Sequence, residues 1–135
     1  MKYYIAPLLL VVLLSGCAKK KNDLEGCFRV KPAAITCADV ILQIQDPEYY
    51  HLAQDNWPNP EDGNRVYHHV FIVKNYCAFT NSLNTVFPPG TDLSLGYRVK
   101  LTADGPDADG CSTCFALFTG LPAIRRSVLA VAQCD

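Results

Sequence analysis

The chain lacks the features by which several protein classes are recognised. Its charge is nearly balanced, with 12 Lys and Arg against 13 Asp and Glu in 135 residues, and no basic stripe marks a nucleic-acid surface. It contains no nucleophile elbow, HExxH, phosphate-binding loop or glycine-rich nucleotide fingerprint. Its long apolar run, residues 5–14, would form a helix of about 15 Å, too short to span a bilayer. These absences disfavour nucleic-acid binding, motif-bearing enzymes and a permanent membrane helix.

The N-terminus carries an ordered series of signals. Lys2 precedes the apolar run, and the small residues Ser15 and Gly16 lie between Leu14 and Cys17. This order resembles the signal peptide and lipobox of bacterial lipoproteins, in which a peptidase cuts just before a cysteine that carries diacylglycerol. The resemblance covers residues 1–17 only. It implies removal of the signal peptide 1–16, lipidation of Cys17 and attachment through two or three acyl chains, which suffice for stable anchoring.

The residues after Cys17 predict where the anchor holds the protein. Residues 17–26 are polar and charged without periodicity, so we expect a lipidated flexible tether. Ala18 stands where the family's sorting rules place an aspartate for inner-membrane retention, which favours the outer membrane. We therefore expect a lipid-anchored protein of the cell envelope, on its periplasmic or surface face. The expected partners are the membrane and an envelope protein or glycan, and no nucleic acid.

The cysteine count agrees with an exported protein. Of seven cysteines, the lipid would consume Cys17 and leave an even number for an oxidising compartment, which predicts three disulfides. Pairing of Cys27 with Cys134 would join the two ends of the domain, but the sequence does not choose among the pairings. The disulfide candidates are Cys27, Cys37, Cys77, Cys111, Cys114 and Cys134.

Residues 27–135 predict a single disulfide-bonded β domain. Alternating or β-branched stretches predict strands at 27–31, 37–45, 66–74, 93–102 and 126–134, the last of which has a helix as its alternative. Asp46, Pro47 and Glu48 favour the start of one short helix that ends near Ala53. The expected fold is mostly β, a small antiparallel barrel or sandwich of about five strands stapled by disulfides, with an OB-type barrel as a candidate topology.

Three patterns are candidates for chemistry. Cys111 and Cys114 form a CxxC pair, which in some proteins exchanges disulfides or binds a metal. Neighbouring His68 and His69 would point to opposite faces of a strand, which disfavours a shared metal. The segment 105–110 matches only part of a calcium loop, so we interpret it as a polar turn. We expect no metal, no cofactor and no catalytic residue.

A recognition surface is the remaining candidate. Aromatic residues on the loops of a rigid β scaffold commonly bind sugars, peptides or proteins, and the alternative is that such rings cover the end of the barrel. The sequence thus predicts a membrane-anchored lipoprotein with a non-enzymatic binding or scaffolding role. The alternative is a periplasmic thiol–disulfide oxidoreductase or metal-binding protein that uses Cys111 and Cys114. The candidate ligand-binding residues are Tyr49, Tyr50, His51 and Trp57.

Overall fold

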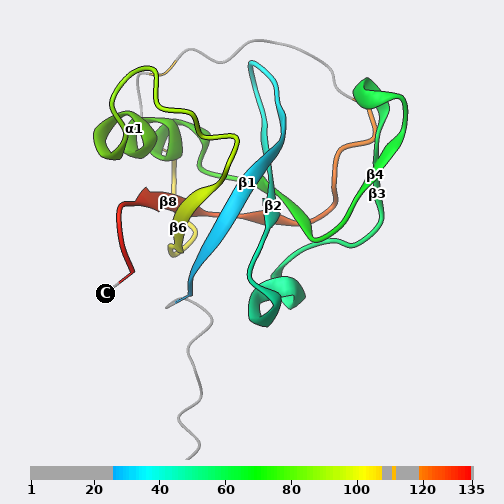
Figure 1. Ribbon diagram of the computed structural model, residues 1–135, viewed down its shortest axis with the longest axis horizontal. Coiled ribbons are helices and arrows are strands. Elements are labelled where there is room, and N and C mark those ends of the chain that lie inside the picture. Colours follow the sequence, from blue (N-terminus) through cyan, green and yellow to red (C-terminus); the bar gives the residue numbers. More distant parts are fainter. Residues whose placement is uncertain (1–25, 108–110, 112–118, 135) are drawn as a thin grey trace, which may run out of the picture.

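The main feature of the fold is a six-stranded sheet that curls into a nearly closed barrel (Figure 1). We describe it from a computed structural model, which describes residues 26–107, 111 and 119–134. The strand order is β7-β5-β2-β1-β6-β8. In chain order these strands are β1 (Cys27–Ile35), β2 (Val40–Ile44), β5 (Val70–Val73), β6 (Tyr97–Leu101), β7 (Arg125–Arg126) and β8 (Val128–Val131).

The barrel closes through the last strand. β7 and β8 lie at opposite ends of the sheet order, yet Ser127 alone separates them in the chain. β7 pairs with β5 in parallel, whereas β8 pairs with β6 antiparallel. If β7 and β8 are taken as one bent strand, the spatial order is first, second, third, fifth, fourth, and helix α1 (Tyr76–Val86) connects the third to the fourth. This is the connectivity of an OB-type barrel, and the predicted fold class is confirmed.

Alternate residues of the strands fill the barrel interior. Val40, Leu42 and Ile44 of β2 are buried together with Tyr97, Val99 and Leu101 of β6. Each fully buried large apolar side chain contributes about 1.5–3 kcal/mol of hydrophobic stabilisation. The other strands supply Phe28, Val30, Phe71, Val73, Val128 and Ala130.

A small hairpin packs on the outside of the barrel. Its strands are β3 (Trp57–Asn59) and β4 (Arg65–Tyr67), joined through the 3₁₀ helix η3 (Pro60–Asp62). Its Trp57 packs with Ile41, Val70 and Ile72, residues that alternate with the inward-facing ones. The outer face of β2 and β5 is therefore covered by the chain's own hairpin.

The predicted strand 66–74 is wrong as a single element. β4 ends at Tyr67 in the hairpin sheet and β5 begins at Val70 in the barrel sheet. Between them His69 has φ +55, in the left-handed region where few non-glycine residues lie. That conformation turns the chain from one sheet into the other, so the predicted two-residue alternation holds within β5 only.

Two other predicted strand boundaries also differ from the structure. β1 was expected to stop at Pro32 but continues to Ile35. Its pairing with β6 ends at Val30 and Tyr97, so β6 offers no hydrogen bond that the missing N–H of Pro32 would have to make. The strand predicted from residue 93 begins only at Tyr97. Gly96, directly before β6, has φ +97, a conformation that favours glycine. Glycine also fits the space there, since a Cβ atom would lie 2.8 Å from the Val30 carbonyl oxygen.

Helix α1 is absent from the prediction, because its polar residues gave no apolar period. Those residues bond to the edge of β8 instead: the Asn75 side chain accepts from Val128 N and donates to Val128 O, both at 2.9 Å. The Ala130 N–H donates to Ser82 Oγ at 2.8 Å. The predicted short helix at 46–53 is confirmed as the 3₁₀ helix η2 (Pro47–Leu52), although Asp46 accepts from Arg29 N and does not cap it through its side chain.

Candidate functional site

Disulfides fix both ends of the described domain. Cys27 at the start of β1 is bonded to Cys134, with their Cα atoms 5.8 Å apart, as the position of these cysteines at the two ends suggested. Cys77 in α1 is bonded to Cys111, and Cys37 is also disulfide-bonded. Each cysteine among the described residues therefore lies in a disulfide, as expected for a domain in an oxidising compartment.

The CxxC pair is split by this pairing. Cys111 bonds to Cys77, 34 residues away, and Cys114 lies outside the described residues. Asp107, from the segment interpreted as a polar turn, accepts from the N–H groups of Cys77 and Ala78 at 2.8 and 2.9 Å. The bond and the two hydrogen bonds attach this segment to the first turn of α1, where a carboxylate is favourable. Asp109 of the same segment lies outside the described residues.

Two of the four predicted ligand-binding residues take part in packing. Tyr49 stacks on Phe28 with ring centroids 4.9 Å apart, against the barrel core. Trp57 is 3% exposed, and its indole Nε1 donates to the Gly120 carbonyl at 2.6 Å. A small cavity of about 20 Å³ beside Trp57 has room for a single water. Trp57 thus holds the hairpin on the barrel.

The other two predicted residues lie beside a histidine cluster. Tyr50 stacks on His69 with centroids 3.6 Å apart and is partly buried against the barrel core, and His51 is exposed next to it in η2. His68 Nδ1 lies 2.7 Å from Asp55 Oδ1, and both side chains are about half exposed. We call Tyr50, Asp55, His68 and His69 the histidine patch.

Hydrogen bonding favours the ionised form of Asp55 in this patch. The hydrogen bond from His68 lowers the pKa of the Asp55 carboxyl below its usual value. Gln43 Nε2 donates to the His68 carbonyl at 2.9 Å, which fixes the backbone at the turn. The patch therefore presents a carboxylate, two imidazoles and a tyrosine on one surface. Asp55 and the two histidines were not predicted as site residues, because Asp55 lies in a polar loop and a single strand over 66–74 would point His68 and His69 to opposite faces.

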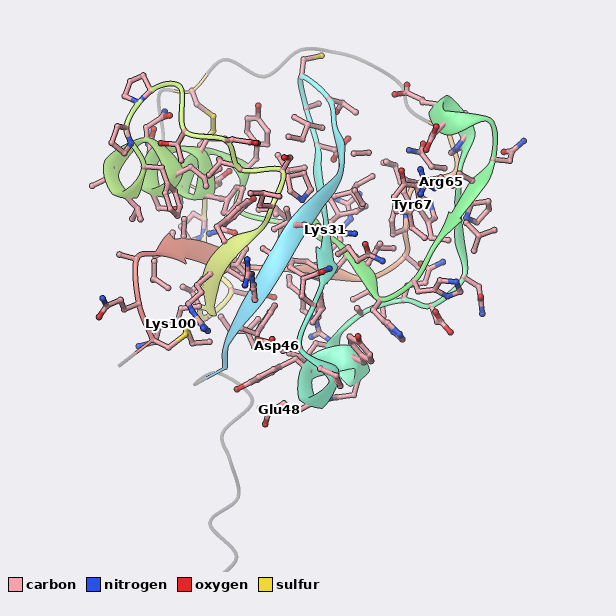
Figure 2. All side chains as sticks on the ribbon, in the orientation of Figure 1. Lys31, Asp46, Glu48, Arg65, Tyr67 and Lys100 are labelled. Atoms are coloured by element: carbon pink, nitrogen blue, oxygen red, sulfur yellow. A yellow bond between two sulfur atoms is a disulfide. The ribbon has the colours of Figure 1, made fainter. Side chains whose placement is uncertain are left out.

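The outer surface of the hairpin has a separate polar arrangement. The Arg65 guanidinium lies 5.6 Å from the centroid of the Tyr67 ring, and the Tyr67 hydroxyl donates to Asp62 at 2.8 Å (Figure 2).

Among residues 26–107, 111 and 119–134, no three His, Cys, Asp or Glu side chains are grouped to hold a metal. In the same part of the chain no helix has the length and apolarity to cross a membrane.

Comparison with known proteins gives no relative from which a role could be transferred. No protein-family model, curated protein or solved structure shows a significant match to this chain.

Proposed function

We propose that the protein is a lipid-anchored bacterial lipoprotein of the cell envelope, attached through Cys17 to the outer membrane. The observation that carries this proposal is the order of charge, apolar run and small residues before Cys17. The disulfide bonding of Cys27, Cys37, Cys77, Cys111 and Cys134 supports it, because disulfides persist in exported proteins.

Within the envelope, we assign the domain a binding or scaffolding role without chemistry. The histidine patch supports this role, because it combines a partly exposed aromatic stack with hydrogen-bonding groups on a disulfide-braced barrel. The hydroxyl groups of glycans and the amide groups of peptides can form hydrogen bonds with these side chains. The expected partner is therefore an envelope glycan or protein.

Mass spectrometry of the full chain produced in a Gram-negative host tests the anchor. We expect loss of residues 1–16, a lipid mass on Cys17 and no thiol alkylation before reduction. The Cys17→Ser chain should carry no lipid and should keep residues 1–16, because the cut requires the lipidated cysteine. Unmodified Cys17 with a retained N-terminus would contradict the anchor, and rapid alkylation of Cys111 and Cys114 would favour the thiol–disulfide oxidoreductase instead.

The same experiment resolves the third disulfide. Since Cys27, Cys134, Cys77 and Cys111 are paired and Cys37 is bonded, the cysteine left after lipidation of Cys17 is Cys114. Non-reduced peptide mapping should therefore recover a Cys37–Cys114 peptide. A Cys111–Cys114 peptide would contradict this arrangement.

Binding to purified peptidoglycan and cross-linking to envelope proteins in cells test the patch. The Tyr50→Ala, His68→Ala double variant should lose most of the signal to its partner, because it removes the aromatic face and one hydrogen-bonding group. Glu61→Ala, an exposed change on the hairpin, is the matched control. The patch is not the binding surface if the double variant keeps every partner that the unmodified chain captures.

A further inference from the structure

The outer face of β1 and β6 carries a cluster of basic side chains. Two basic residues on each strand alternate with residues that point into the barrel, so all four side chains lie on the outside (Figure 2). They are Arg29 and Lys31 on β1 and Arg98 and Lys100 on β6, and we call them the basic face. The register places Arg29 directly opposite Arg98. Because the two strands are far apart in the chain, the sequence itself shows no basic stripe.

Acidic side chains do not balance this charge. The sheet order places β2, β1, β6 and β8 side by side, and none of these four strands contains an aspartate or a glutamate. In the part of the chain that the structure describes, no residue of the basic face forms an ion pair. From residue 26 onward the sequence has 8 basic and 11 acidic residues, so half of the basic ones lie on a single face of an acidic domain.

The arrangement is unfavourable for the domain by itself. Arg29 and Arg98 repel each other, because like charges directly opposite on antiparallel strands are destabilising. The Arg29 guanidinium donates to the Leu95 carbonyl at 3.1 Å, and the Arg98 guanidinium contacts the Cys134 sulfur at 3.7 Å, so neither bond neutralises a charge. Asp46, at the edge of this face, accepts from the backbone N–H of Arg29 and offsets at most one of the four charges. A bound anionic surface would relieve this repulsion.

Apolar side chains adjoin the basic face. The Leu95 side chain is 78% exposed, and the backbone of this residue lies at the Arg29 guanidinium. Leu129 and Val131 of β8, both half-buried, lie directly opposite the two basic residues of β6. Basic residues beside exposed aliphatic side chains are typical of surfaces that lie among the headgroups of an anionic bilayer.

We propose that the basic face docks on a membrane surface that contains anionic phospholipids. Its four cations are attracted by the phosphate headgroups, and Leu95 adds apolar contact. Cys27, the first residue of β1, lies opposite Lys100 at this face. The ten residues from Cys17 to Cys27 span at most about 36 Å, so a domain held by the proposed anchor, on which this step rests, reaches the leaflet that carries its lipid.

Lysine acetylation of the full lipidated chain, mapped by peptide mass spectrometry, tests the docking. The chain is added to phosphatidylcholine vesicles with or without phosphatidylglycerol, so that its lipid holds it on both. We expect Lys31 and Lys100 to react at least about fivefold more slowly on the anionic vesicles. Lys74, which pairs with Asp104 at the end of β5, should react equally on both. About 0.5 M NaCl should remove the difference, because salt screens the attraction.

Substitutions separate this face from net charge. The Arg98→Gln, Lys100→Gln chain should lose the protection of Lys31, and Leu95→Ser should weaken it. The matched control is the Arg65→Gln, Arg125→Gln chain, which removes two charges from exposed positions on other strands and should keep the protection.

The proposal is overturned by equal acetylation rates on the two kinds of vesicle, or by a control chain that loses protection as fully as the Arg98→Gln, Lys100→Gln chain. Protection by a soluble oligonucleotide or acidic polysaccharide, but not by anionic vesicles, would assign the face to a polymer and also overturn it. Failure of lipidation is a separate result, because the mass of the chain shows it beforehand. An unlipidated chain should still cosediment more with the anionic vesicles than with the neutral ones, and equal cosedimentation would overturn the docking.

Discussion

Trp57 shows how a single side chain links two parts of the chain that are far apart in sequence. Its ring packs on the outer face of β2 and β5, and its N–H reaches Gly120 in the segment before β7. A tryptophan in a polar stretch, followed by prolines at 58 and 60, is typical of an exposed recognition site, yet burial of the ring here stabilises the fold.

Replacement of Trp57 should therefore destabilise the domain. We expect Trp57→Ala to lower the free energy of unfolding by about 3–5 kcal/mol through loss of buried ring area and the cavity left behind. Trp57→Phe keeps most of the packing and loses the bond to Gly120, which should cost about 1–2 kcal/mol. Urea unfolding followed by circular dichroism measures both. A cost below about 1 kcal/mol for Trp57→Ala would show that the hairpin is not held by this ring.

The lowered pKa of Asp55 predicts that the folded domain loses stability in acid. Because its pKa is lower in the folded state than in the unfolded state, the His68–Asp55 interaction stabilises the fold above the ordinary carboxyl pKa. That stabilisation is lost as the pH falls through the lowered pKa, so the effect lies below about pH 4. We expect the free energy of unfolding of the Asp55→Asn chain to fall less steeply between pH 6 and pH 2 than that of the unmodified chain.

His68→Gln is the matched variant for this effect, since the His68 hydrogen bond is the largest cause of the lowered Asp55 pKa. It should reproduce most of the change seen for Asp55→Asn, and the two changes should not be additive. Stability curves of the Asp55→Asn and unmodified chains that run parallel over this pH range would argue against the interaction.

At the scale of elements, α1 acts as a substitute strand for the edge of β8. Asn75 presents an amide to both backbone groups of Val128, as a neighbouring strand would, and Ser82, about two helical turns further along, accepts from Ala130. The helix therefore covers the edge of β8 that faces away from its partner strand β6. This role explains why polar residues recur in a segment that packs against the barrel.

Asn75→Ala should be costly for this reason. Asn75 is 8% exposed, so its loss leaves the buried N–H and C=O of Val128 without partners. We expect a decrease of about 2–4 kcal/mol in the free energy of unfolding. Asn84→Ala, on an exposed position of the same helix, should change stability by less than about 0.5 kcal/mol. Amide hydrogen exchange at Val128 and Ala130 should accelerate in the Asn75→Ala chain alone, and unchanged exchange there would contradict the role.

At the scale of the whole molecule, two disulfides brace the barrel in different ways. Cys27–Cys134 spans 107 residues and joins both ends of the described domain, whereas Cys77–Cys111 spans 34 and holds the loop after β6 to α1. In the chain-entropy description the stabilisation grows with the length of the closed loop.

Removal of the longer crosslink should therefore cost more. We expect the Cys27→Ser, Cys134→Ser pair to lose about 4–5 kcal/mol and the Cys77→Ser, Cys111→Ser pair about 1 kcal/mol less. Chemical unfolding without reductant measures the difference. Equal losses, or a larger loss for the shorter loop, would show that local packing and not chain entropy governs these bonds.

The extent to which the fold was predictable varies with the element. The strands with regular alternation, β2, the core of β6 and the final strand, were predicted from sequence, because burial of one face imposes a two-residue period on the residues themselves. Helix α1 and the division between β4 and β5 were not. Asn75, Ser82 and Asp107 gain their roles from backbone groups 29 to 53 residues away, and His69 adopts a conformation that its residue type rarely takes.

The sequence by itself determined the mostly β class, the short helix after Asp46, and the disulfide bonding of the cysteines from Cys27 onward that the structure describes. These follow from local preference and from counting. Tertiary structure alone decided which cysteines pair, that Trp57 is buried, and that Tyr50 meets His69 while Asp55 meets His68. Those outcomes depend on distances between segments remote in the chain, which are fixed only when the barrel closes.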